Sequence, residues 1–135
     1  MRIALDSSVL IAANISRAGV CAELLEDLLL HHELVTSEFI LEELERKLLE
    51  KFSFPKREVG QVAAFLRRAA LVVVPANMPS AVCRDPTDLP VLGTAVGGDC
   101  ALLVSVDRDL LDMQRINEIP IIRPGEYWRR TTNVS

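Results

Sequence analysis

The 135-residue chain is half apolar, has few aromatic residues and carries a net charge of −4. This composition is typical of a folded domain rather than a disordered chain, and the length fits a single domain. No apolar run approaches the roughly 18 residues that a membrane helix needs, and Asp6 interrupts the first run too early for a secretory signal. A cytoplasmic location without membrane attachment is therefore expected. The acidic balance disfavours a simple phosphate-tracking protein, but it is compatible with an acidic cluster neutralised by divalent cations.

In the first half of the chain, residues 2–5 form a short apolar run that predicts a buried strand. Asp6 and the two serines after it favour the start of a helix. Apolar residues recur at helical spacing over 18–31 and over 38–51, and the short strand 34–36 lies between these helices. Pro55 suits the first turn of a further helix that reaches Arg68.

In the second half, the β-branched run 71–74 ends at Pro75 and predicts a third strand. Residues 76–84 are the longest predicted loop. The helix expected next covers 86–96 and ends at two glycines. The remaining predicted elements are a strand at 102–105, a short helix at 107–113, a strand at 119–122 and a helical turn at 124–128. The polar tail 129–135 is expected to fray.

Strands thus alternate with helices, and the strands are apolar throughout rather than at alternate positions. This pattern predicts an α/β fold with about five mostly parallel strands and helices on both faces of the sheet. The three cysteines, Cys21, Cys83 and Cys100, are far apart and odd in number, which indicates reduced thiols rather than disulfides.

Acidic residues fall where the predicted strands end. Asp6 directly follows the first strand, and Asp107 follows the strand 102–105. Asp88 lies near the start of the helix that precedes that strand, and Glu43 lies beside the apolar stripe of the helix 38–51. Each of these residues taken alone could be a helix cap or part of a solvated face. In an open parallel sheet, however, ligands bind beyond the carboxyl ends of the strands.

Several carboxylates at one edge of a sheet repel one another unless a positive charge lies between them. Mg²⁺ and Mn²⁺ prefer carboxylate and water oxygens, and such ions can clamp a phosphodiester for in-line attack by water. No nucleophilic cysteine or serine–histidine pair accompanies the acids. The sequence therefore indicates metal-assisted hydrolysis of a phosphate ester.

Five sequence blocks resemble the PIN-domain (PilT N-terminus) nucleases, and the likeness is closest to the stand-alone proteins grouped as toxin components of toxin–antitoxin systems. The blocks, in chain order, are residues 3–10, 36–44, 83–88, 104–111 and 120–127. The second resembles the family's helix that carries Glu-Leu, which makes Glu43 rather than Glu42 the second acid. The blocks cover nearly the whole chain in the family's order.

The resemblance implies a three-layer α/β/α domain over residues 1–128 that cleaves single-stranded RNA with one or two Mg²⁺ or Mn²⁺ ions. It also implies a homodimer and an antitoxin protein as partner. The catalytic and metal-binding residues would be Asp6, Glu43, Asp88 and Asp107. Supporting roles are expected for Ser8, Asp85, Ser105 and Asp109, and contacts to the substrate phosphate for Arg84 and Arg108.

The sequence departs from the family pattern at a few positions. Ser8 stands where the family usually has Asn, Thr87 and Leu89 replace carboxylates, and Ser105 replaces Thr. A catalytically weak or inactive RNA- or protein-binding module of the same fold is therefore the main alternative.

Two other classes that use a strand-end aspartate fit less well. A dehalogenase-like phosphatase would need a second acid at Ser8, and a phospho-acceptor domain would need an aspartate at Val74 or Pro75.

Overall fold

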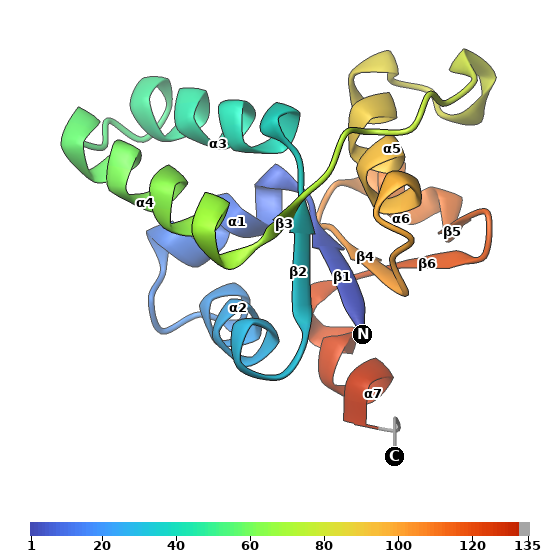
Figure 1. Cartoon of the computed structure of the whole chain (residues 1–135), viewed down its shortest axis with the longest axis horizontal. Helices are drawn as coiled ribbons and strands as arrows, with labels where there is room; N and C mark the ends of the chain where they lie inside the picture. Colours follow the sequence, from blue (N-terminus) through green and yellow to red (C-terminus); the bar gives the residue numbers. More distant parts are fainter. Residues whose placement is uncertain (133–135) are drawn as a thin grey trace.

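The computed structural model describes residues 1–132, and its centre is a six-stranded sheet with the order β3-β2-β1-β4-β6-β5 (Figure 1). The strands are β1 (Arg2–Leu5), β2 (Glu33–Thr36), β3 (Leu71–Val72), β4 (Leu102–Val104), β5 (Arg115–Ile116) and β6 (Ile119–Ile122). All neighbouring pairs are parallel except β5 and β6, which are antiparallel. The structure confirms the predicted α/β class with a mostly parallel sheet.

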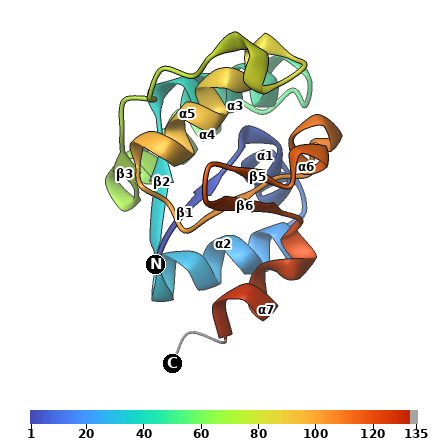
Figure 2. The same ribbon diagram turned by 90° about the vertical axis from the view of Figure 1, so that its right-hand side faces the viewer.

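Helices cover the sheet on two sides, so that α2 and α4 lie to the left of β1 and β2 in Figure 1 and α5 lies to the right. Figure 2 shows α2 and α5 on opposite sides of the strands. The helices are α1 (Ser7–Ile15), α2 (Val20–His31), α3 (Glu38–Glu50), α4 (Lys56–Ala69), α5 (Leu89–Gly97), α6 (Arg108–Met113) and α7 (Tyr127–Thr132). Three 3₁₀ turns are η1 (Ser80–Val82), η2 (Pro86–Asp88) and η3 (Pro124–Glu126).

The core consists of the strands and the apolar stripes of the helices packed on them. Every residue of β4 is buried, as expected for a parallel strand covered on both faces. On α3 the residues Ile40, Leu44 and Leu48 face the core at helical spacing, and Ser37 caps the helix by accepting a hydrogen bond from the Ile40 amide at 3.4 Å. This packing fixes which side of α3 faces the sheet edge.

The strand order reverses between β1 and β4. From β1 the chain builds outward through β2 and β3 on one side, and β4 and β6 lie on the other side of β1. At such a switch point the loops leaving two neighbouring parallel strands run apart, which opens a crevice at their carboxyl ends. The loops that leave β1 and β4 begin at Asp6 and Ser105, and the Asp6 amide donates to the Val104 carbonyl at 3.1 Å.

Several predicted bounds were wrong. β3 ends at Val72 rather than at Val74, because its neighbour β2 ends at Thr36 and offers only one more bond, from the Val73 amide to the Thr36 carbonyl. The predicted helix 86–96 is divided into η2 and α5. Pro90 has no N–H to donate to the Pro86 carbonyl, so the α-helical ladder cannot run through this point.

The sequence also failed to predict β5, so the sheet has six strands rather than about five. Its two residues pair with β6 through the turn Asn117-Glu118, which lacks the usual glycine. At the C-terminus, α7 extends to Thr132, so the tail that was expected to fray from Arg129 is helical up to that residue. The rest of the tail, 133–135, lies outside the described residues.

In the described part of the chain, no single helix is long and apolar enough to cross a membrane. The pair α1 and α2 passes a test of length and composition only when the two helices are taken together, and they are bent by 109° where they meet.

Candidate active site

Asp6 directly follows β1 and caps α1, and its carboxylate is almost fully buried at the switch point. It accepts hydrogen bonds from the hydroxyls of Ser8 and Ser105 and from the Val9 amide at 3.2 Å. Burial raises the pKa of Asp6 above its usual value, and these hydrogen bonds act in the opposite direction. Both serines that the sequence analysis assigned to support therefore touch this carboxylate.

Glu43 reaches the same place from α3. Its carboxylate accepts a hydrogen bond from the Ser7 hydroxyl, and Lys47, one turn further along α3, donates to it at 3.3 Å. Arg46 lies 4.0 Å from its other oxygen. Glu43 is thus the acid with a cationic environment, whereas Asp6 is held by hydroxyl groups.

Asp107 follows β4 and caps α6, where its side chain accepts from the Asp109 amide at 2.9 Å. The Asp107 amide donates to the Ser105 hydroxyl at 2.9 Å, and that hydroxyl donates to Asp6. One serine therefore links the loops that leave β1 and β4 and fixes the two aspartates relative to each other.

Asp88 closes η2 directly before α5 and is also buried, with 7% of its surface exposed. Its Oδ2 atom has no hydrogen-bond partner among the described residues. Burial, followed by the charge of Asp107, raises the pKa of Asp88 from 3.8 to about 7. An unpartnered carboxylate oxygen is costly in a buried position, and a bound cation would compensate for it.

The structure brings these four acids together in one pocket of ≈ 300 Å³. The acids come from four separate segments of the chain, the ends of β1 and β4, the helix α3 and the turn η2. The pocket is lined by Asp6, Ser7, Ser8, Glu43, Arg46, Lys47, Asp85, Thr87, Asp88, Val91 and Asp107.

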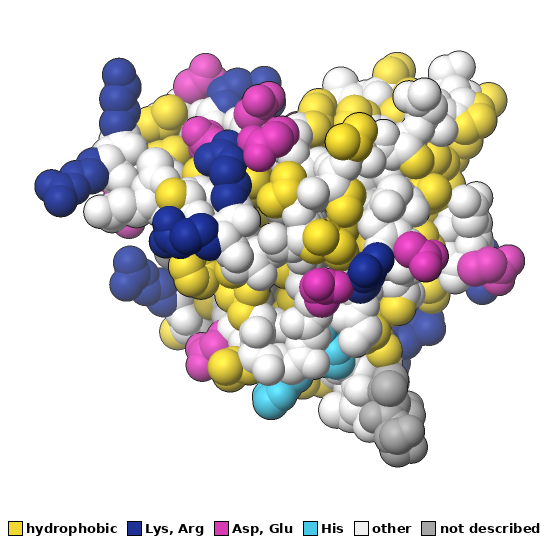
Figure 3. Space-filling model, in the orientation of Figure 1, with side chains coloured by type: hydrophobic (Ala, Val, Ile, Leu, Met, Phe, Trp, Pro, Cys, Tyr) yellow, Lys and Arg dark blue, Asp and Glu magenta, His cyan; other side chains and the backbone are white. Residues whose placement is uncertain are grey.

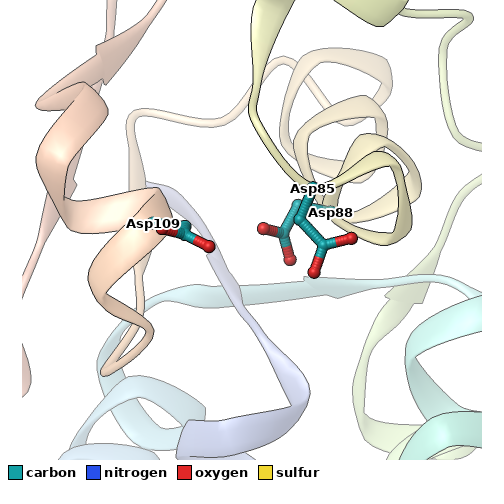
Figure 4. A group of neighbouring side chains, drawn as sticks. All are labelled: Asp85, Asp88 and Asp109. Carbon is teal, nitrogen blue, oxygen red and sulfur yellow. The ribbon is translucent and has the colours of Figure 1, made fainter.

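A second group of carboxylates adjoins the pocket. Asp109 projects from α6 toward Asp85 and Asp88 (Figure 4), and one oxygen from each of the three lies within 4.8 Å of the others. Asp85 accepts hydrogen bonds from the amide and hydroxyl of Thr87 at 3.0 and 2.8 Å, and the amide is the main reason why its pKa is lowered. The two supporting acids of the sequence analysis thus lie beside Asp88.

The cations at the pocket differ from those that the sequence suggested. Of the described residues, Arg46 and Lys47 are the cations that line it. Arg84 instead forms ion pairs with Asp109 at 3.0 Å and Asp112 at 3.1 Å, and Arg108 is exposed at the start of α6. Lys and Arg side chains gather over α3 and α4 on the left of Figure 3.

Three residues of the site, Ser7, Arg46 and Lys47, were not among the site residues expected from the sequence. Arg46 could have been found from its position three residues after Glu43, since such residues share one helix face.

The donor set fits a hard divalent cation. It offers carboxylate oxygens from Asp6, Asp88 and Asp107, hydroxyl groups around them and no thiol or imidazole, which is the chemistry that Mg²⁺ and Mn²⁺ prefer. The unpartnered Oδ2 of Asp88 is the observation that favours a ligand most directly. The three cysteines are free, and two of them, Cys21 and Cys100, are buried.

Fold and site together define a doubly wound α/β protein with a four-acid pocket at its switch point. A family model described as PIN domain matches residues 2–109. The chain therefore belongs to the PIN-domain family, as the sequence blocks indicated.

Solved structures with the same fold are distant in sequence. A chain of VapBC2 from Rickettsia felis, described as bound to a DNA fragment from the promoter, has a TM-score of 0.64 at 14% identity, covering 91% of this chain and 98% of that one. A chain of VapBC-1 from nontypeable Haemophilus influenzae has a TM-score of 0.62 at 19% identity, covering 93% and 99%. No curated protein has a significant sequence match to this chain.

Proposed function

We propose that this protein is a metal-dependent endoribonuclease that hydrolyses phosphodiester bonds of single-stranded RNA at the four-acid pocket. The observation that carries the proposal is the convergence of four carboxylates from separate segments, one of them with a buried, unpartnered oxygen. Such an arrangement destabilises the folded protein when no cation is bound. With a divalent cation it can bind a phosphodiester and activate water. Membership of the PIN-domain family supports the same reaction class.

Asp6, Asp88 and Asp107 would hold Mg²⁺ or Mn²⁺, and Glu43 would hold a second ion or orient the attacking water. The ion supplies Lewis-acid stabilisation for the charge that develops on the phosphate. Ser8 and Ser105 hold the Asp6 carboxylate in place through their hydroxyls, and Ser7 does the same for Glu43. Asp85 and Asp109 would support Asp88 as further oxygen donors near the ion, since one oxygen from each of the three lies within 4.8 Å of the others.

Arg46 and Lys47 give the pocket its positive side. Both lie beside Glu43 and line the pocket, so they can approach a phosphate whose other side faces the acids. We assign them the phosphate contacts that the sequence analysis gave to Arg84 and Arg108. The ion pairs of Arg84 with two aspartates of α6 fit a structural role better.

We further propose that the protein is the toxin component of a toxin–antitoxin pair and acts as a homodimer. The fold shared with chains of two structures described as VapBC supports the toxin role, whereas the homodimer is proposed from the sequence resemblance to the family alone. A protein antitoxin is the partner expected on this basis.

The function is tested by incubating end-labelled, mixed-sequence single-stranded RNA with the protein and Mn²⁺ or Mg²⁺, with and without chelator. We expect cleavage that needs the metal and that Asp6→Asn lowers by at least about a hundredfold, since even outer-sphere changes at metal sites cost ten- to a hundredfold. The matched control is Glu118→Gln, which neutralises an exposed acid in the β5–β6 turn.

Retention of cleavage in Asp6→Asn would remove the pocket from the mechanism. A wild-type protein that binds metal but leaves every RNA intact would instead support the non-catalytic binding module of the same fold.

A further inference from the structure

An apolar hollow of ≈ 580 Å³ lies beside the acidic pocket, between α3 and the segment formed by η2 and α5. Glu43, Arg46 and Thr87 line both spaces. The hollow and the acidic pocket therefore adjoin along these three side chains, so a single ligand can contact both spaces.

Three of the residues that line the hollow have ring side chains, namely Phe39, Pro86 and Pro90. Phe39 lies in the first turn of α3 and keeps part of its surface exposed, and the rings of Pro86 and Pro90 line the space from η2 and α5. Glu42 and Arg46 add polar groups to this lining. The hollow thus combines an aromatic side chain with charged groups of both signs.

A nucleobase matches this lining. It has two apolar faces and a polar edge, and proteins bind unpaired bases by stacking them on aromatic rings or arginine planes and by hydrogen bonds to the edge. The position of the hollow beside the acidic pocket favours a nucleotide over a protein side chain, because only the nucleotide joins a phosphodiester to a flat ring. Arg46 lies where the two parts of that ligand would meet.

On the basis of the ribonuclease activity proposed above, we propose that this hollow is a base subsite. A nucleobase next to the scissile phosphate stacks on Phe39 and is bounded by Pro86 and Pro90, with Arg46 between base and phosphate. The subsite requires a base that is neither paired nor stacked, since a base within a duplex has its edge occupied by its partner and its faces covered by its neighbours. The base subsite would therefore account for a preference for single-stranded over double-stranded RNA.

The test compares wild type with Phe39→Leu on two substrates. One is a single-stranded RNA whose cut position has been mapped, and the other is the same RNA with abasic riboses on both sides of the cut. Loss of a stacking contact predicts that Phe39→Leu raises KM for the intact RNA about tenfold. It should change KM for the abasic RNA less than about twofold, because the contact is already absent there.

Two further variants show whether the effect of Phe39→Leu comes from the lost stacking contact or from a change in folding. Phe39→Tyr keeps the aromatic face and should retain the wild-type KM. Phe65→Leu makes the same chemical change at an exposed position of α4 and should alter neither substrate's KM. If Phe39→Leu changes KM equally for intact and abasic RNA, or changes neither, the base subsite is overturned.

Failure of the ribonuclease proposal would be seen separately, as a wild-type protein that cuts no RNA. The same comparison is then made by fluorescence anisotropy, with labelled intact and abasic oligoribonucleotides in the presence of Mn²⁺. A Kd that Phe39→Leu weakens about tenfold for intact RNA alone would support the subsite. Equal Kd values for the two oligonucleotides would overturn it.

Discussion

At the scale of single residues, the acidic pocket is a set of carboxylates held close together by hydroxyl groups. Ser8 and Ser105 donate to Asp6, and Ser7 donates to Glu43. At Asp6 the two serine hydroxyls lower the pKa and so oppose the effect of burial. Asp88 lacks such a donor at its Oδ2 atom. It is the carboxylate whose environment most strongly requires a further ligand.

Asp88→Asn should therefore stabilise the metal-free protein. The amide cannot carry the charge that burial and Asp107 oppose, and above about pH 7 the loss of that charge should contribute on the order of 2 kcal/mol after allowance for screening by water. We expect the melting temperature in chelator to rise by about 2–8 °C. Glu118→Gln, an exposed acid, is the control and should change it little. A lower melting temperature for Asp88→Asn would mean that its carboxylate is satisfied in the free protein.

The pH dependence of stability follows from the same groups. The pKa of Asp88 is raised from 3.8 to about 7, so the folded state keeps a proton that the unfolded state loses between about pH 4 and 7. The free energy of unfolding in chelator should therefore fall as pH rises through this window and level off above it. Asp6, whose pKa is also raised, acts in the same direction. Glu38 and Asp85 have lowered pKa values, so they stabilise the folded state above about pH 5 and lose that contribution only as pH falls below it.

Urea unfolding at intervals between pH 5 and 8 measures this effect. We expect a loss on the order of 2 kcal/mol after allowance for screening by water in the pocket. Asp88→Asn should flatten the slope, and Mn²⁺ should reverse it because the ion binds the deprotonated carboxylates. A wild-type stability in chelator that rises steadily from pH 5 to 8 would argue against a raised pKa at Asp88.

At the scale of elements, the sequence predicted strands and helices best where the apolar pattern is long. The helix predicted over 38–51 is α3 within one residue, because four buried residues and a serine cap define it. The short elements were harder to predict. β5 has two residues and an atypical turn, and the split between η2 and α5 depends on a missing N–H at Pro90. Such details change the position of Asp88, which lies at that split.

The loop before η1 also depends on a feature of α5 that the sequence does not reveal. A Cβ on Gly93 would lie 2.3 Å from the Ala76 carbonyl oxygen and 3.1 Å from the Pro75 side chain. The Ala76 amide donates to the Gly93 carbonyl at 2.8 Å, so the loop runs directly against the helix. Only glycine permits this approach, and it positions the segment that leads to Asp85 and Asp88.

Gly93→Ala should consequently destabilise the protein by about 1–3 kcal/mol, because backbone atoms must move apart. Gly60→Ala is the matched control on α4, where an added Cβ meets nothing within 4 Å. The control should stabilise the fold by up to about 1 kcal/mol through helix propensity. Chemical denaturation of the two variants measures both effects, and equal stabilities would contradict the close packing of the loop on α5.

At the scale of the whole molecule, the reversal of strand order between β1 and β4 explains why residues far apart in the sequence form one site. The alternation of apolar strands and helices was enough to predict the sheet and to place Asp6 and Asp107 at its carboxyl edge. It could not give the rotation of α3 against η2, which depends on tertiary packing. For that reason Arg46 was not predicted at the pocket, and Arg84 was expected to contact phosphate although it pairs with Asp109 and Asp112.

Binding of Mn²⁺ tests the central claim most directly, and isothermal titration calorimetry at neutral pH measures it without any assumption about the substrate. We expect the wild type to bind one or two ions per chain. Asp6→Asn and Asp107→Asn should each weaken binding at least about tenfold, whereas Glu118→Gln should bind like wild type. A wild-type protein that binds no Mn²⁺, or binds it equally well after both substitutions, would contradict a cation site at the four-acid pocket.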